Sequence, residues 1–274
     1  MNNSVSNEAA ARRASAKSVA LPAEKGSWSL VSEPILLGLL AAPSWAGAAL
    51  AVGAFATFLC NRPLKVYLAD RRRGRAYERT ALARRYLALY AAIAVAGFAG
   101  GLALGGWRPF APLAAAVPLL ALFAFYDQRP GRHWQAELAA PVAFAAIVAA
   151  MGLADGWAWS PALGLWGFMI ARAVPAVLFI RARLRLDKGK EAAPGESLPA
   201  VFVAHVLALV AVAGLAWLGW LPWLAVVAAA VLLARAVWGL SAWRWRISVI
   251  ALGFLETGFG VLAVLLVAIG SWLR

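Results

Sequence analysis

Nine long apolar runs dominate the sequence. They lie near residues 28–43, 44–60, 86–106, 110–126, 138–155, 158–180, 199–219, 222–241 and 247–272. About 20 apolar residues cross the hydrocarbon of a bilayer as a helix, whereas the strands of a membrane barrel alternate over about ten residues. The runs therefore predict an all-α polytopic membrane bundle of about nine transmembrane helices. Only Pro43 and Ser44 separate the first two runs, which are short, so a single re-entrant element is an alternative there.

Composition supports a membrane protein with one domain. Hydrophobic residues make up 64% of the 274 residues, against about 45–50% in soluble domains. We expect residues 1–27 to form a disordered cytosolic tail and residues 28–274 a single transmembrane domain. The one cysteine, Cys60, excludes an internal disulfide and a cysteine-based zinc site.

The basic residues predict the orientation in the membrane. The chain has 26 Lys and Arg against 12 Asp and Glu. With the N-terminus inside, 22 of these cations fall on inner segments and two on outer segments. Since short basic loops stay in the cytoplasm, the N-terminus is expected inside and the C-terminus outside, in a bacterial cytoplasmic (inner) membrane. The cations are spread over membrane-proximal loops, which favours anionic lipid headgroups over nucleic acid as partners.

Two inner loops concentrate charge. Residues 61–85 carry nine basic residues and only Asp70 and Glu78 as acids, and a short amphipathic helix lying on the membrane is expected there. Residues 181–199 place Asp187 and Glu191 four apart, on one face of a helix. These two carboxylates could hold a divalent cation if a diphosphate supplied further oxygens. Alternatively, they neutralise neighbouring cations such as Arg183 and Lys188.

The two loops resemble those of the UbiA superfamily of intramembrane prenyltransferases, which follow helices two and six. In that family the first motif begins with Asn and places Asp four and eight residues later. Here Asn61 is followed by Lys65 and Ala69, and an aspartate comes one step late at Asp70. The second motif is partly kept as Asp187, Glu191 and Gly195, followed by a Ser-Leu-Pro sequence at 197–199.

A closer resemblance is to the YwiC-like family of bacterial membrane proteins. The family's N-terminal Glu-His-Gly-x-Trp signature is similar to the segment from Glu24 to Trp28, which leads to Pro34 and has Lys25 in place of the histidine. The Arg62-Pro63-Leu64 triplet, the RARLRL run before Asp187 and the segment from Gly253 to Glu256 also resemble that family.

The UbiA resemblance implies a site at the inner mouth of the bundle for a prenyl or polyisoprenoid diphosphate. It implies catalytic roles for Asp70, Asp187 and Glu191, with Mg²⁺ held by the last two. Lys65 cannot hold Mg²⁺, but it can pair with a diphosphate as a point charge. The implied substrate-binding residues at this mouth are Asn61, Arg62, Lys65 and Lys188. A transporter or a non-catalytic lipid-handling protein is the alternative function, and the resemblance leaves enzymatic activity and oligomeric state open.

Ionisable residues inside the spans are further candidates, because each is costly in lipid unless it faces protein or water. Glu33, Arg172 and Glu256 are expected to bind substrate, or else to pair as structural bridges. Arg235 either joins those pairs or extends its side chain so that the guanidinium reaches the membrane surface. A lone histidine such as His205 is more often a satisfied bundle residue than a ligand.

Overall fold

The computed structural model describes residues 16–22, 27–74, 77–127, 134–189 and 197–274. These residues form nine long helices and no strand, so the predicted all-α bundle is confirmed for the described chain. The helices are α2 (Ser27–Ala41), α3 (Trp45–Arg72), α4 (Glu78–Gly105), α5 (Phe110–Asp127), α6 (Trp134–Ala154), α7 (Trp159–Asp187), α8 (Leu198–Trp217), α9 (Trp223–Leu240) and α10 (Val249–Trp272).

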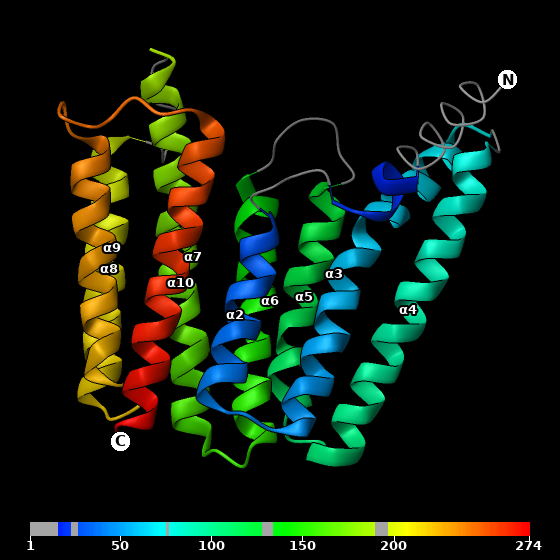
Figure 1. Cartoon of the computed structure of the whole chain (residues 1–274), viewed down its shortest axis with the longest axis horizontal. Coiled ribbons are helices and arrows are strands. Elements are labelled where there is room, and N and C mark those ends of the chain that lie inside the picture. Colours follow the sequence, from blue (N-terminus) through cyan, green and yellow to red (C-terminus); the bar gives the residue numbers. More distant parts are fainter. Residues whose placement is uncertain (1–15, 23–26, 75–76, 128–133, 190–196) are drawn as a thin grey trace, which may run out of the picture.

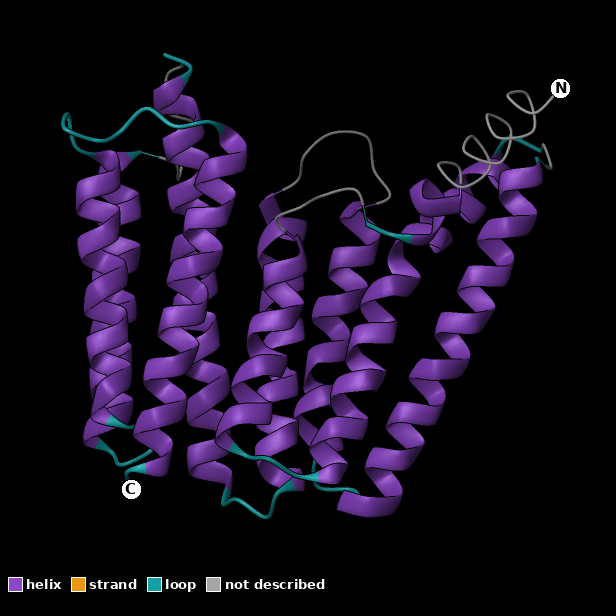
Figure 2. Cartoon of the chain, viewed as in Figure 1, coloured by secondary structure: helices purple, strands orange, loops and turns teal. Residues whose placement is uncertain are grey.

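Consecutive helices run in opposite directions and lie roughly parallel (Figures 1 and 2). Helices α7–α10 form one side of the bundle, and α3, α4 and α5 lie on the other side. Helix α2 lies between the two sides and contacts α6, α10 and α3. The first long helix of the chain therefore lies between the two sides of the bundle.

Length and composition allow eight of the helices to cross a membrane. The shorter helix, α2, has 15 residues, or about 22 Å at 1.5 Å per residue, against a hydrocarbon thickness of about 30 Å. Large apolar side chains such as Val210 and Phe254 are exposed on the outside of the bundle, as expected for surfaces that contact lipid. These features describe a multi-pass helical bundle.

Three helices extend beyond the apolar runs that predict them. Helix α3 continues to Arg72, α4 already begins at Glu78, and α7 continues to Asp187. Residues 61–72 are helical, as expected, but they are continuous with α3 and do not form a separate helix. Polarity marks where a helix leaves the hydrocarbon, whereas backbone hydrogen bonding continues into water. Arg71 and Arg72 in the last turn of α3 favour this extension through the helix dipole.

Part of the segment expected as a tail packs on the bundle. Residues 16–20 are helical, and Val19 and Ala20 are buried. Arg62 Nε donates a hydrogen bond to the carbonyl oxygen of Ser18 at 3.0 Å. The rest of the predicted tail, residues 1–15 and 23–26, lies outside the described residues.

Close packing of α3 against α4 depends on glycine. A Cβ atom added at Gly97 would lie 2.7 Å from the Cα atom of Gly53, whereas one added at Gly100 would lie 3.4 Å from Ala49 Cβ, an ordinary contact. We expect Gly97→Ala to lower the free energy of unfolding by about 1–3 kcal/mol, because the two backbones must separate. Gly100→Ala, three residues away on the same helix, is the matched control and is expected to be neutral or slightly stabilising. Thermal unfolding of both variants in detergent checks this, and equal midpoints would contradict it.

Candidate functional site

A cluster of ionisable side chains lies inside the bundle. Its five members come from five helices and are each less than 10% exposed. They are Glu33 on α2, Arg172 on α7, His205 on α8, Arg235 on α9 and Glu256 on α10. With both acids ionised and His205 neutral, the cluster has no net charge. We call these five residues the core cluster.

Glu33 and Arg172 form a two-contact ion pair. Arg172 Nε lies 2.6 Å from Glu33 Oε2, and Arg172 Nη2 donates to Glu33 Oε1 at 2.7 Å. The same Nη2 lies 3.4 Å from the backbone oxygen of Glu256 on α10. A Cβ atom at Gly260 would overlap both the Glu33 carboxylate and the Arg172 guanidinium. Gly260 therefore provides the space in which the pair lies against α10.

Arg235 and Glu256 pair less completely. Arg235 Nη1 lies 3.2 Å from Glu256 Oε1, but neither carboxylate oxygen of Glu256 has a hydrogen-bond partner among the described residues. The Arg235 guanidinium lies over the Phe179 ring at 4.1 Å from its centroid, a cation–π contact. Its side chain is 2% exposed, so the alternative that Arg235 reaches for the membrane surface is wrong.

His205 borders a small cavity beside these pairs. Its Nδ1 lies 2.8 Å from the carbonyl oxygen of Val201, while Nε2 has no hydrogen-bond partner within the described part of the chain. The cavity is lined by His205, Arg172, Phe168 and Ala229, among others, and it has room for about one water molecule. One side of the histidine is thus held by the backbone, and the other is free to exchange a proton or a hydrogen bond.

Two acids at the ends of α3 and α5 are paired with cations. Lys65 Nζ lies 2.7 Å from Asp127 Oδ1, and Asp70 accepts hydrogen bonds from Arg79 at 2.5 and 3.0 Å. Thr80 also donates to Asp70, at 2.7 Å. These contacts join the ends of α3, α4 and α5. Asp127 was not predicted as the partner of Lys65. The one signal for it in the sequence is that Asp127 directly follows the apolar run 110–126.

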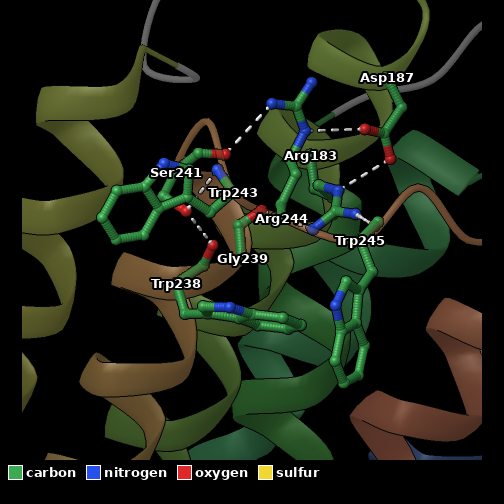
Figure 3. Close-up of polar contacts among 8 residues, drawn as sticks. All are labelled: Arg183, Asp187, Trp238, Gly239, Ser241, Trp243, Arg244 and Trp245. Carbon is green, nitrogen blue, oxygen red and sulfur yellow. Dashed lines mark hydrogen bonds and ion pairs between the residues drawn. The ribbon is translucent and has the colours of Figure 1, made fainter.

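Asp187 lies in a separate network at the end of α7 (Figure 3). Its two oxygens accept from Arg183 Nε at 2.8 Å and from Arg244 Nε at 3.1 Å. The guanidinium of Arg183 also donates to the backbone oxygens of Gly239, at 2.5 Å, and Trp245. Asp187 therefore acts as a neutralising partner of Arg183, which was one of the two alternatives for this residue. Arg244, 57 residues away in sequence, was not expected as its second partner.

The predicted headgroup residues do not meet in one place. Asn61, Arg62, Lys65 and Asp70 lie near the end of α3, whereas Asp187 ends α7 on the opposite side of the bundle (Figure 1). Lys188 follows Asp187 and is exposed, and Glu191 lies outside the described residues. No group of three or more His, Cys, Asp or Glu side chains suited to a metal ion occurs in the described ranges. Both oxygens of Asp187 are occupied by arginines, so this carboxylate does not fit a Mg²⁺ ligand in this arrangement, and Mg²⁺ binding stays a prediction.

Comparison with known families gives one match, to part of the chain. Residues 21–152 match the family model described as YwiC-like protein. This part of the chain is therefore similar to the YwiC-like family. The resemblance to the YwiC-like family is thereby confirmed over that range. No curated protein and no solved structure matches the chain.

The YwiC-like region covers α2 to most of α6. It contains Glu33 and the helix α2 that carries it, whereas Arg172, His205, Arg235 and Glu256 lie after its end. The core cluster therefore joins the YwiC-like region to α7–α10. The pairing of Glu33 with Arg172 is one of the polar contacts that span this boundary.

The Glu33–Arg172 pair is expected to be strongly coupled energetically. Removing either side chain leaves a buried charge unpaired, so Glu33→Ala and Arg172→Ala should each lower the free energy of unfolding by about 3–5 kcal/mol. The double variant should lose less than the sum of the two. A double-mutant cycle measured by denaturant unfolding in bicelles tests this.

The Glu137–Arg181 pair supplies the matched control for this cycle. Its nitrogen–oxygen distance of 2.9 Å is similar, but both side chains are about a quarter exposed. The coupling there should stay below about 1 kcal/mol. Additive effects at Glu33 and Arg172 would show that the pair is not a coupled unit.

Proposed function

We propose that this protein is a membrane carrier that moves an anionic solute together with protons through the core cluster. The observation that carries the proposal is the incomplete hydrogen bonding of the cluster. Six buried atoms of the cluster have no hydrogen-bond partner among the described residues: Glu256 Oε1 and Oε2, Arg235 Nε and Nη1, His205 Nε2 and Arg172 Nε. A purely structural ion pair in an apolar interior is stable only when such atoms are satisfied. Ionisable residues inside membrane bundles commonly mark proton relays and solute pathways.

Glu256 is the proton-carrying group in this proposal. Glu33 is held by two contacts to Arg172, whereas Glu256 has one loose contact to Arg235. Protonation of Glu256 gives the cluster a net charge of about +1 and leaves Arg235 without a carboxylate partner. An anionic solute then binds Arg235 in place of Glu256. His205 and the cavity beside it offer the proton a route toward this pair.

This proposal is tested by replacing the proton carrier. Glu256→Gln keeps the shape of the side chain and removes its titration, so proton binding by the cluster should be lost. Proteoliposomes adsorbed on a solid-supported membrane report proton binding as a transient current after a pH jump, with no need to know the solute. We expect Glu256→Gln to lose most of this current.

Glu137→Gln is the control variant, because Glu137 is paired with Arg181 and about a quarter exposed at the end of α6. It should retain the current of the unchanged protein. A current of equal size in Glu256→Gln and the unchanged protein would contradict the proposal. Infrared difference spectra of the same samples, which report protonation of a buried carboxyl group, should lose that signal only in Glu256→Gln.

Binding or processing of a prenyl diphosphate at the inner mouth is the second candidate. The observation in its favour is that the Lys65 side chain stays about a third exposed at the end of α3, beside Arg62 in sequence. Mg²⁺ held by Asp187 and Glu191 would supply Lewis-acid stabilisation of the leaving diphosphate. Asp187 would first have to release Arg183 and Arg244.

A pair of variants at one contact tests this candidate. Lys65→Ala removes the ammonium and should weaken binding of a prenyl diphosphate severalfold. Asp127→Ala removes the carboxylate that neutralises Lys65 and should strengthen it. Binding and turnover are measured with and without Mg²⁺, together with mass spectrometry of co-purified lipids. The candidate would be contradicted if both variants bound the prenyl diphosphate equally, no isoprenoid co-purified with the protein and no prenyl diphosphate were turned over.

A further inference from the structure

The loop between α9 and α10 holds two exposed tryptophans in a fixed position. Trp243 and Trp245 are 86% and 70% exposed. Ser241 Oγ donates to the carbonyl oxygen of Trp238 at 2.8 Å and accepts from the backbone nitrogen of Trp243 at 3.2 Å. The ring of Trp245 packs edge-on against that of Trp238, with centroids 4.9 Å apart. Figure 3 shows this arrangement.

The loop is held from the bundle side by arginines. Arg183, whose side chain is 2% exposed, donates to the backbone of Gly239 and Trp245 on either side of the turn. Arg244 donates to the carbonyl oxygen of Ser241 at 3.2 Å and also contacts Asp187. A buried guanidinium that holds two backbone carbonyls fixes the loop against α7. The exposed indoles are therefore presented by a rigid support.

An apolar groove runs along the outer side of α9 up to this loop. Its volume is about 590 Å³. Leu233 and Val237 line its length, and Trp238, Ser241 and Trp243 line its end. The groove is open, and its lining is apolar except for Ser241 and the indole N–H groups. Its shape and chemistry suit a flexible hydrocarbon chain.

The loop beside the groove is basic. Arg246 is exposed and has no partner among the residues that the structure describes, while the Arg244 guanidinium is already engaged by Asp187 and Ser241. The protein as a whole carries a formal net charge of +14. Tryptophan is enriched at the level of the lipid headgroups, and basic residues there favour anionic phospholipid over zwitterionic phospholipid.

We propose that this loop and groove form a binding site for one anionic phospholipid. An acyl chain lies along Leu233 and Val237 of α9, and the headgroup phosphate is recognised by Arg246 and the indole N–H of Trp243. The site lies on the outer side of α9 and is independent of the core cluster. It differs from the general attraction of basic loops to the membrane because it has defined contacts for one lipid molecule.

Native mass spectrometry of the protein released from mixed vesicles tests the site. The vesicles contain phosphatidylglycerol and phosphatidylcholine with identical acyl chains, so that only the headgroup charge differs. We expect one phosphatidylglycerol to remain bound preferentially. The double variant Trp243→Ala/Arg246→Ala should lower its retention about tenfold, which corresponds to about 1.4 kcal/mol. Arg246→Ala alone should remove most of the preference for phosphatidylglycerol.

The matched control is Trp217→Ala/Arg84→Ala, which removes the same residue types, both exposed, from other parts of the protein. It should retain the lipid as the unchanged protein does. Equal loss in the two double variants would overturn the proposal, since contact with general annular lipid would then explain the retention. Equal retention of the two lipids by the unchanged protein would also overturn it. Circular dichroism and gel filtration of each variant confirm that the bundle remains folded.

Discussion

The free-energy cost of burying a charged side chain in an apolar bundle constrains how the helices of this protein are arranged. Glu33 and Arg172 come from helices separated by more than a hundred residues, and neither charge is stable there without the other. Their contact requires α2 to lie beside α7 and α10, and Gly260 leaves the space for it. The position of the short helix α2 at the centre of the bundle follows from this requirement as well as from apolar packing with α6 and α10.

The second pair in the core cluster has a different character. Arg235 contacts the Phe179 ring as well as Glu256, and neither oxygen of the Glu256 carboxylate has a hydrogen-bond partner among the described residues. Glu33 thus has two short contacts with its arginine, whereas Glu256 has one longer contact within the same apolar interior. The proposed carrier function requires this difference. The Glu33–Arg172 pair holds the helices together, and Glu256 is the residue that gains and loses a proton.

Much of the fold could be predicted from the sequence. The apolar runs predict nine helices because each must cover its backbone polar groups in lipid. Glu33, Arg172 and Glu256 could also be selected as interior polar residues, since an ionisable group within an apolar run needs a partner. The choice of partner could not be predicted, because either acid is chemically compatible with either arginine and only tertiary packing brings Arg172 to Glu33.

The polar ends of the helices were harder to predict. Polarity marks the membrane boundary near residue 60, but helical hydrogen bonding continues to Arg72, so the sequence pattern ends the helix too early. The contacts of Asp187 with Arg244 and of Lys65 with Asp127 join segments that are 57 and 62 residues apart. The spacing of Asp187 and Glu191 suggested a metal-ion site. Such local spacing carries no information about arginine or lysine partners that are distant in sequence.

One face of α7 connects the interior to the membrane surface. Arg172, Phe179 and Arg183 are seven and four residues apart, about two turns and one turn of helix, so they project from the same side. Along this side α7 contacts Glu33, then Arg235, and then the backbone of the α9–α10 loop. A small rotation or axial shift of α7 would therefore move the buried acid–arginine pairs and the tryptophan-bearing loop at the same time. The two proposed sites share no residue, but α7 would transmit a shift at one of them to the other.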